Sequence, residues 1–195
     1  MKRLVLVRHG ETEWNALRRL QGQTDIALND RGRGQARALA PMVGGLAPDL
    51  AVSSDLKRAA ETALLLGVDA RPEPRLREQD LGDWSGREIA ALDAGEYQAW
   101  RAGQFVPEGA ETWAVFRARV ALAMRDALAA AERTAVLICH GGVIRAALDA
   151  ALELAPSRII PVGPGSMTVL AYPSGGARLE AFNLRGGSLE LNAPD

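Results

Sequence analysis

Three short apolar runs stand out along the chain, each rich in branched side chains and each followed at once by polar residues. They cover residues 4–7, 50–52 and 135–138. An unbroken apolar run of this length predicts a strand buried on both faces, because a strand with one solvated face would alternate apolar and polar residues. Strands of that kind need helices on both sides of their sheet.

Stretches with helical spacing of apolar residues separate these strands. They predict helices over 30–44, 55–66, 113–131 and 142–152. Strand and helix alternate with connections too long for hairpins, which is typical of a largely parallel sheet. Two further strands, 167–172 and 179–184, flank Ser174-Gly175-Gly176 and predict an antiparallel hairpin. The predicted fold class is therefore α/β: a three-layer αβα sandwich around a mostly parallel, mixed central sheet.

The domain organisation follows from what the chain lacks. Residues 1–195 show no repeat, no low-complexity tract and no linker, so we expect a single domain. Residues 72–111 fit the strand and helix pattern least, since they contain proline, glycine and two tryptophans without a clear period. We expect an irregular, lid-like insertion there rather than core sheet.

Composition limits the partners and the cellular compartment that we expect, and says less about the chemistry. The 23 basic residues nearly balance 24 acidic ones, so no strong field favours a nucleic-acid partner. The apolar stretch after Lys2 and Arg3 is too short for a signal peptide or a membrane span. Cys139, the single cysteine, lies in an apolar run, as expected of a protein kept in the reducing cytoplasm. Only two histidines are present, so imidazole chemistry must use His9 and His140.

Polar side chains follow each of the three buried strands, as Arg8-His9-Gly10, Ser53-Ser54-Asp55 and His140-Gly141-Gly142. The carboxyl ends of parallel strands meet at one edge of a sheet, where neighbouring strands lie only about 4.8 Å apart. These groups can therefore converge on one small ligand. Arg58 should join them, since it falls in the first turn of the helix that Ser54 or Asp55 would cap.

The chemistry of such a cluster favours a phosphate. A phosphomonoester is close to dianionic at neutral pH, guanidinium groups match its oxygens in pairs, and glycines let backbone N–H groups approach it. Each residue alone has a plainer explanation, because a histidine after a strand is more often structural and an arginine beside it is usually solvated. A zinc site is the other specific interpretation, but two histidines without clustered cysteines or a close His-x-x-x-His spacing make a weak ligand set. The combination therefore indicates an anion site, and we expect no metal.

The sequence LVRHGETEWN, from Leu6 to Asn15, resembles the signature of the histidine phosphatase superfamily, which includes cofactor-dependent phosphoglycerate mutases and many small phosphatases. Further matches follow in order over nearly the whole chain: Gln21-Gly22 with Asp25, Leu28 and Gly32; Ser53-Ser54-Asp55-Leu56 before Arg58-Ala59 and Thr62; Glu78 before Gly82, Trp84 and Gly86; and His140-Gly141-Gly142. Two positions depart from the family pattern. Cys139 stands where Ser or Thr is more usual, and Glu61 where Gln is common.

The resemblance implies a small, metal-independent phosphatase with a phosphoglycerate mutase-like fold and no cofactor. It implies that His9 is the nucleophile that becomes phosphohistidine, that Arg8, Arg58 and His140 hold the phosphoryl group, and that Glu78 is the acid/base. Substrate contacts would come from Asn15, Gln21, Gly22 and Gly141. From composition alone, Glu11, Glu13 or Asp80 would serve as acid/base as well as Glu78, so only the resemblance selects Glu78.

Three functions share these residues. A phosphatase transfers the phosphoryl group from histidine to water, a cofactor-dependent phosphoglycerate mutase transfers it to a second substrate hydroxyl, and a non-catalytic member of the fold would only bind phosphate. The compact length favours the phosphatase, and the presence of the full residue set speaks against the non-catalytic member. The expected partner is a small phosphorylated metabolite, and the sequence leaves a homodimer open.

Overall fold

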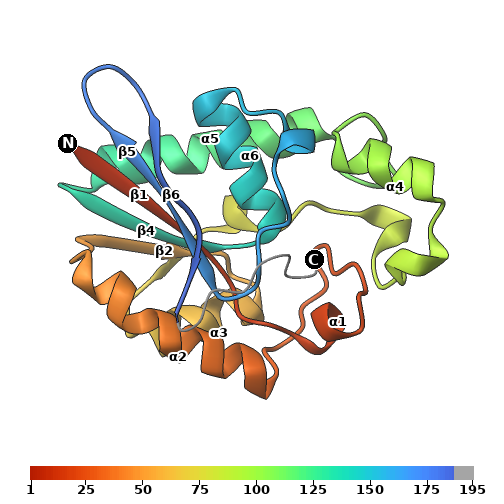
Figure 1. The fold of residues 1–195 in the computed structure, drawn as a ribbon, viewed down its shortest axis with the longest axis horizontal. Helices are drawn as coiled ribbons and strands as arrows, with labels where there is room; N and C mark the ends of the chain where they lie inside the picture. Colours follow the sequence, from red (N-terminus) through yellow and green to blue (C-terminus); the bar gives the residue numbers. More distant parts are fainter. Residues whose placement is uncertain (187–195) are drawn as a thin grey trace.

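The computed structural model describes residues 1–186, which form one six-stranded sheet between two layers of helices (Figure 1). The strands are β1 (Lys2–Arg8), β2 (Leu50–Ser53), β3 (Arg71–Pro72), β4 (Thr134–Cys139), β5 (Ser166–Tyr172) and β6 (Arg178–Arg185). The helices are α1 (Glu13–Ala16), α2 (Asp30–Gly45), α3 (Lys57–Leu66), α4 (Ala94–Arg101), α5 (Trp113–Ala130) and α6 (Gly141–Leu152). Four 3-10 turns join them: η1 (Pro74–Leu76), η2 (Gly82–Trp84), η3 (Ile89–Ala91) and η4 (Pro156–Arg158).

The sheet is mixed and mostly parallel. Its strand order is β3-β2-β4-β1-β5-β6. The first four strands run parallel to one another, β5 is antiparallel to β1, and β6 is antiparallel to β5. Arg8 of β1 lies opposite Cys139 of β4, and Ser53 of β2 lies opposite Ile138. The carboxyl ends of β1, β4 and β2 therefore form one row, and the predicted fold class is confirmed.

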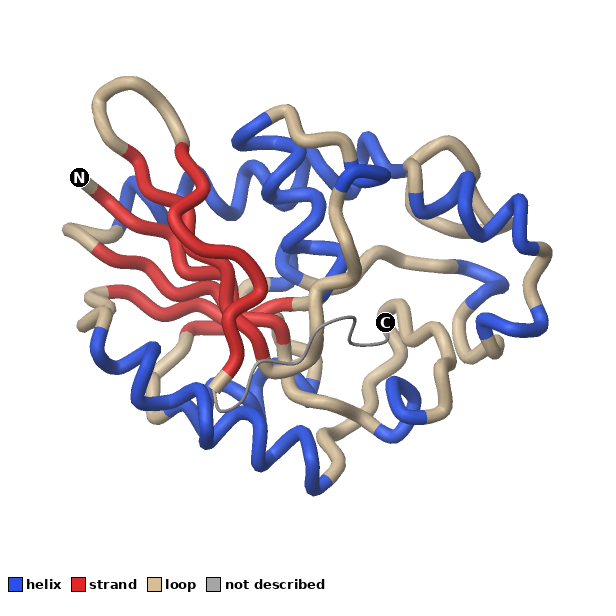
Figure 2. The backbone as a smooth tube through the Cα atoms, viewed as in Figure 1, coloured by secondary structure: helices blue, strands red, loops and turns tan. Residues whose placement is uncertain are grey.

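Side chains alternate between two cores along the central strands. Leu6 and Leu137 point to the core under α5 and α6, whereas Val7 and Ile138 point to the core over α2 and α3. All four are fully buried, as the unbroken apolar runs predicted for β1 and β4. Figure 2 shows the strands in red between these helical layers.

Two details of the predicted elements are wrong. The strand over 50–52 is only half-buried, because it lies near the sheet edge with just the two-residue β3 beyond it. The helix predicted over 55–66 begins at Lys57, and neither Ser54 nor Asp55 is its N-cap. Asp55 instead pairs with Arg77 at 2.5 Å, and Asp25 accepts a hydrogen bond from the Lys57 backbone N–H at 2.7 Å.

The segment from 72 to 111 contains more regular structure than its sequence indicates. It includes η1, η2, η3 and the helix α4, which lies far from the N-terminus in Figure 1. A separate cluster centred on Leu20, Leu81 and Trp84 packs against Trp100 and Phe105. Trp84 stacks on Phe105 at 5.4 Å and meets Trp100 edge-on at 5.9 Å. A lid function for this segment stays a prediction.

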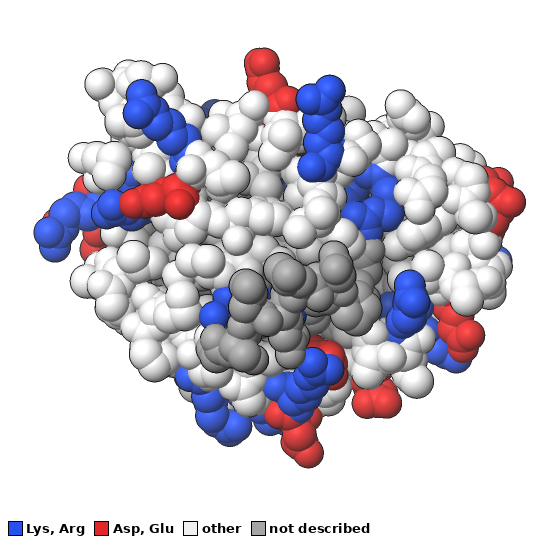
Figure 3. Space-filling view, viewed as in Figure 1, with Lys and Arg blue, Asp and Glu red and all other residues white. Residues whose placement is uncertain are grey.

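One face of the molecule shows charge of both signs. On the face shown in Figure 3, basic and acidic side chains are interspersed around the outline, in keeping with the formal net charge of −1. Among residues 1–186, no helix is both long and apolar enough to cross a membrane.

The fully buried Leu137 in β4 should be a main source of stability. Leu137→Ala is expected to lower the free energy of unfolding by about 2–5 kcal/mol, because it removes apolar surface and leaves a cavity between β4 and its covering helices. Urea unfolding of both proteins measures this difference. The matched control is Leu64→Ala on α3, where the side chain is 77% exposed, and a change of at most about 0.5 kcal/mol is expected. Equal effects at the two sites would contradict this assignment of the core.

Candidate active site

Two histidines meet at the carboxyl edge of the sheet. His9 follows β1 and His140 follows the neighbouring β4, and the His9 backbone N–H donates to the Cys139 carbonyl at 3.0 Å. Their ring centroids are 5.1 Å apart at an interplanar angle of 62°. The parallel register of β1 and β4 thus places the only two imidazoles of the chain side by side.

One nitrogen of the His9 ring is hydrogen-bonded to the backbone, and the other can act as a nucleophile. Its Nδ1 lies 2.7 Å from the Gly10 carbonyl oxygen, which can only accept, so Nδ1 carries the proton and Nε2 has the lone pair. Burial lowers the pKa of His9 well below its usual value of 6.5, and the cations Arg58 and Arg8 lower it further. A neutral imidazole with a free Nε2 is the form that acts as a nucleophile.

Arg58 is fully buried and connects the parts of the site. Its Nε donates to His140 Nδ1 at 3.2 Å, and its two terminal nitrogens donate to the carbonyls of Thr24 and Gly22, each at 2.7 Å. Burial lowers the pKa of Arg58 to about 10, which leaves the guanidinium charged at neutral pH. The first turn of α3 therefore brings a permanent cation to the strand edge, as the sequence predicted.

His140 lies behind the site rather than in its wall. It is fully buried, its Nε2 bonds to Ser54 Oγ at 2.9 Å, and it is not among the described residues that line the cavity. Since Nδ1 accepts from Arg58, Nε2 carries the proton. Burial, followed by the charge of Arg58, lowers the pKa of His140 well below 6.5. His140 contacts the rest of the site through Arg58 and through the edge of the His9 ring, and a role in holding the phosphoryl group stays a prediction.

Arg8 and the glycines after β4 lie close together. Arg8 donates to the Val162 carbonyl, and a Cβ added at Gly141 would stand only 3.4 Å from the Arg8 guanidinium. At Gly142 an added Cβ would meet the Glu78 carboxylate at 2.2 Å. The space at Gly142 is therefore taken by the Glu78 carboxylate, whereas a side chain at Gly141 would only touch Arg8, and the small residues let the start of α6 come near a small anion.

Glu78 reaches the start of α6 from the irregular segment before η2. One carboxylate oxygen accepts from the Gln79 backbone N–H at 2.9 Å, and the other accepts from the Gly142 backbone N–H at 3.0 Å. The side chain thus lies at the cavity wall, in the same lining as Arg8 and His9. The other carboxylates considered for its role, Glu11, Glu13 and Asp80, are not part of that lining.

Asn15 and Gln21 also line the cavity. The Thr12 backbone N–H donates to the Asn15 amide oxygen at 3.1 Å, and the Thr12 hydroxyl donates to the Gln21 amide oxygen at 3.0 Å, so the oxygen ends of both side chains are held by the protein. Their NH₂ groups are the ends suited to donate to a ligand oxygen. Gly22, in the left-handed region at φ +50°, turns its carbonyl toward Arg58 rather than toward a substrate.

These residues surround an open cavity of about 750 Å³. Its outer wall is made of residues that the sequence did not single out as site residues: Arg19, Leu20, Leu81, Ile89, Tyr97, Arg101 and Arg145. Trp100 of α4 is also part of this wall. A signal for Arg145 was present, because it is the one charged residue in the run 141–148 that follows His140. Within residues 1–186, no group of three or more His, Cys, Asp or Glu side chains gathers as a metal site would require.

Comparison with known proteins agrees with this geometry. Residues 4–185 match the family model described as the histidine phosphatase superfamily, branch 1. The glucosyl-3-phosphoglycerate phosphatase of Mycobacterium tuberculosis H37Rv is 41% identical over 172 residues, which cover 80% of this chain and 77% of that protein. A probable phosphoglycerate mutase GpmB of Proteus mirabilis is 37% identical over 166 residues, covering 79% of this chain and 76% of that protein.

Solved structures give the same result. The structure of mycobacterial glucosyl-3-phosphoglycerate phosphatase with VO3 superposes with a TM-score of 0.88 at 38% identity, covering 94% of this chain and 99% of that one. The complex of the same phosphatase with inorganic phosphate has a TM-score of 0.84 at 36% identity, covering 94% and 98%. With the family model spanning nearly the whole chain and the two histidines joined at one sheet edge, this protein belongs to branch 1 of the histidine phosphatase superfamily.

Proposed function

We propose that this histidine phosphatase hydrolyses small phosphomonoesters through a phosphohistidine on His9. The observation that carries the proposal is the state of His9: its ring is neutral, its Nδ1 proton is held by the Gly10 carbonyl, and its Nε2 is left at a cavity that Arg8 and Arg58 also line. An imidazole held in this way needs no further deprotonation before it attacks phosphorus.

In the first step the lone pair of His9 Nε2 forms a bond to phosphorus while the bond from phosphorus to the ester oxygen breaks. Charge on the transferring group spreads over its three equatorial oxygens, and Arg8 and Arg58 stabilise it from fixed positions. Glu78 gives a proton to the departing alkoxide. In the second step Glu78 takes a proton from water, whose oxygen attacks phosphorus and releases His9 and inorganic phosphate.

The outer cavity favours an ester that carries a sugar and an acidic group. Tyr97 and Trp100 offer aromatic faces on which a sugar ring can pack, and Arg101 and Arg145 bring positive charge suited to a carboxylate. The mycobacterial relatives are named as phosphatases of glucosyl-3-phosphoglycerate, which combines these features. We propose a phosphorylated glycerate bearing a sugar as the substrate class.

A mutase would use the same first step and differ in the acceptor. One group of relatives is named as probable phosphoglycerate mutases, so the fate of the phosphoryl group has to be measured. The named phosphatase matches at 41% identity over 172 residues and the Proteus mutase at 37% over 166, which favours water as the acceptor.

Replacing the nucleophile tests the proposed reaction. His9→Ala should abolish turnover of p-nitrophenyl phosphate, because Nε2 is lost while the surrounding arginines remain. Phosphate release is the readout, and thermal unfolding shows that the variant is folded. The wild-type protein should keep its activity in the presence of a metal chelator. Near-native kcat in His9→Ala, or complete loss on chelation, would refute the proposal.

The substrate class is tested by removing one group at a time. Glucosyl-3-phosphoglycerate should have at least about tenfold higher kcat/KM than the same compound without its carboxylate, which corresponds to about 1.4 kcal/mol. Arg145→Met should reduce that preference. The control is Arg125→Met, which changes an exposed arginine of α5 outside the cavity lining and should leave the preference unchanged. With 3-phosphoglycerate the protein should release phosphate faster than it forms 2-phosphoglycerate. An equal kcat/KM for both glucosyl compounds would remove the acidic group from the proposal, and faster isomerisation would identify a mutase.

A further inference from the structure

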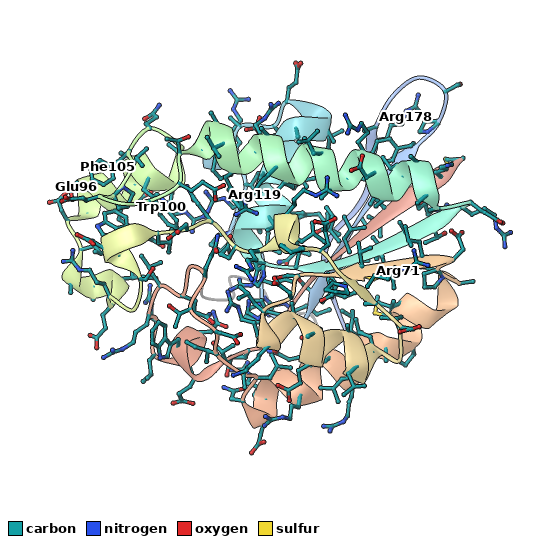
Figure 4. The ribbon with its side chains drawn as sticks, turned by 180° about the vertical axis from the view of Figure 1, so that it is seen from behind. Arg71, Glu96, Trp100, Phe105, Arg119 and Arg178 are labelled. Carbon is teal, nitrogen blue, oxygen red and sulfur yellow. The ribbon has the colours of Figure 1, made fainter. Side chains whose placement is uncertain are left out.

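A single guanidinium outside the cavity holds the chain segment that carries Glu78. Arg119 belongs to α5, and Figure 4 shows it near the centre of the molecule, where this segment passes below α5. It makes five hydrogen bonds, one for each N–H that a guanidinium has to donate. Every donor of this side chain is therefore directed at a protein acceptor.

Three of these bonds go to the backbone around Glu78. Arg119 donates to the carbonyls of Arg75 and Arg77, each at 2.7 Å, and to the carbonyl of Glu78 itself at 2.9 Å. The residues from Arg77 to Leu81 lie between η1 and η2, in neither helix nor strand, so no ladder of backbone hydrogen bonds fixes them. Arg119 supplies the constraint that regular secondary structure gives elsewhere.

The guanidinium is itself held in one orientation. Glu111 accepts from it through both carboxylate oxygens, at 2.7 Å and 2.8 Å, and the Phe116 ring lies 4.7 Å below it. The Arg119 and Glu111 side chains are only 18% and 12% exposed, so solvent screens this ion pair weakly. Glu111 also holds Gln79, the residue after Glu78, because the Glu111 backbone carbonyl accepts from the Gln79 side chain at 2.8 Å.

The carboxylate end of Glu78 is fixed from the other side. It accepts from the Gly142 N–H in the first turn of α6, two residues after His140. Glu78 is thus held between two helices that pack on each other: α5 holds its main chain and α6 holds its carboxylate. A proton donor is effective only if it reaches the leaving oxygen at hydrogen-bond distance, so small shifts of this segment should matter.

From these contacts we infer that Arg119 is a positioning residue for the acid/base Glu78, an inference that rests on the proposed function of Glu78. Arg119 does not line the cavity and touches no reacting atom. Its part is to keep the Glu78 backbone at the distance from which the carboxyl group serves both the leaving oxygen and the attacking water. A lysine keeps the charge but has fewer donors and no planar fork, so it cannot replace these bonds.

The test compares leaving groups in Arg119→Lys. An alkyl phosphate such as glycerol phosphate needs a proton on its leaving oxygen, whereas p-nitrophenolate leaves readily without one. We expect kcat for glycerol phosphate to fall roughly 10- to 10²-fold and kcat for p-nitrophenyl phosphate to fall much less. Competitive inhibition by inorganic phosphate should be unchanged, because Arg8 and Arg58 are untouched. Glu78→Gln should show the same split between substrates, only larger.

Arg117→Lys is the matched control. Arg117 is on the same helix but bonds to Asp149, away from Glu78, and its substitution should affect both substrates equally or not at all. An equal loss on both substrates in Arg119→Lys, or no loss, would overturn the inference and leave Arg119 a structural residue.

Two further outcomes separate the inference from the proposed function. If Glu78→Gln itself shows no split between leaving groups, the proposed role of Glu78 fails, and the inference about Arg119 fails with it. If Arg119→Lys does not fold, Glu111→Gln decides, since it keeps the shape of the residue and weakens the alignment of Arg119. A leaving-group split in Glu111→Gln supports the inference, and its absence overturns it.

Discussion

The site depends on a guanidinium, that of Arg58, which is buried without a bond to any carboxylate of residues 1–186. Removing such a charge from water costs several kcal/mol, and the cost is acceptable only where the protein supplies hydrogen bonds in return. Arg58 receives them from two loop carbonyls and from His140. The same contacts fix the loop from Gly22 to Thr24 and the orientation of His140, so the charge and the shape of the site arise together.

Burial, together with the buried cation, keeps both histidines neutral. Desolvation and the neighbouring arginines lower the pKa of both imidazoles, so both stay neutral at a place that is otherwise positively charged. Positive potential attracts a dianionic phosphate, while neutrality keeps a lone pair on His9 for attack. One side chain could not both carry a positive charge and keep a free lone pair. Here the arginines carry the charge and His9 keeps the lone pair.

Much of this was readable from the sequence, because it depends on periodicity and on order along the chain. Unbroken apolar runs identified β1 and β4, and the polar residues after them had to meet at one edge once the sheet was parallel. The sequence could not show that His140 would lie behind Arg58. Whether a side chain at the end of a strand faces the cavity or the protein interior depends on tertiary packing. It also missed α4. It misplaced the start of α3, because Asp25 bonds to Lys57 and Arg77 bonds to Asp55 from more than twenty residues away along the chain.

The central claim is that His9 carries the phosphoryl group, and trapping that intermediate tests it most directly. The protein should be mixed with substrate, quenched within milliseconds in alkali, where phosphohistidine survives, and mapped by mass spectrometry of its peptides. The account predicts a phosphoryl group on the peptide containing His9 and none on the peptide containing His140. Phosphate on the His140 peptide, or turnover with no phosphorylated peptide at any quench time, would contradict it.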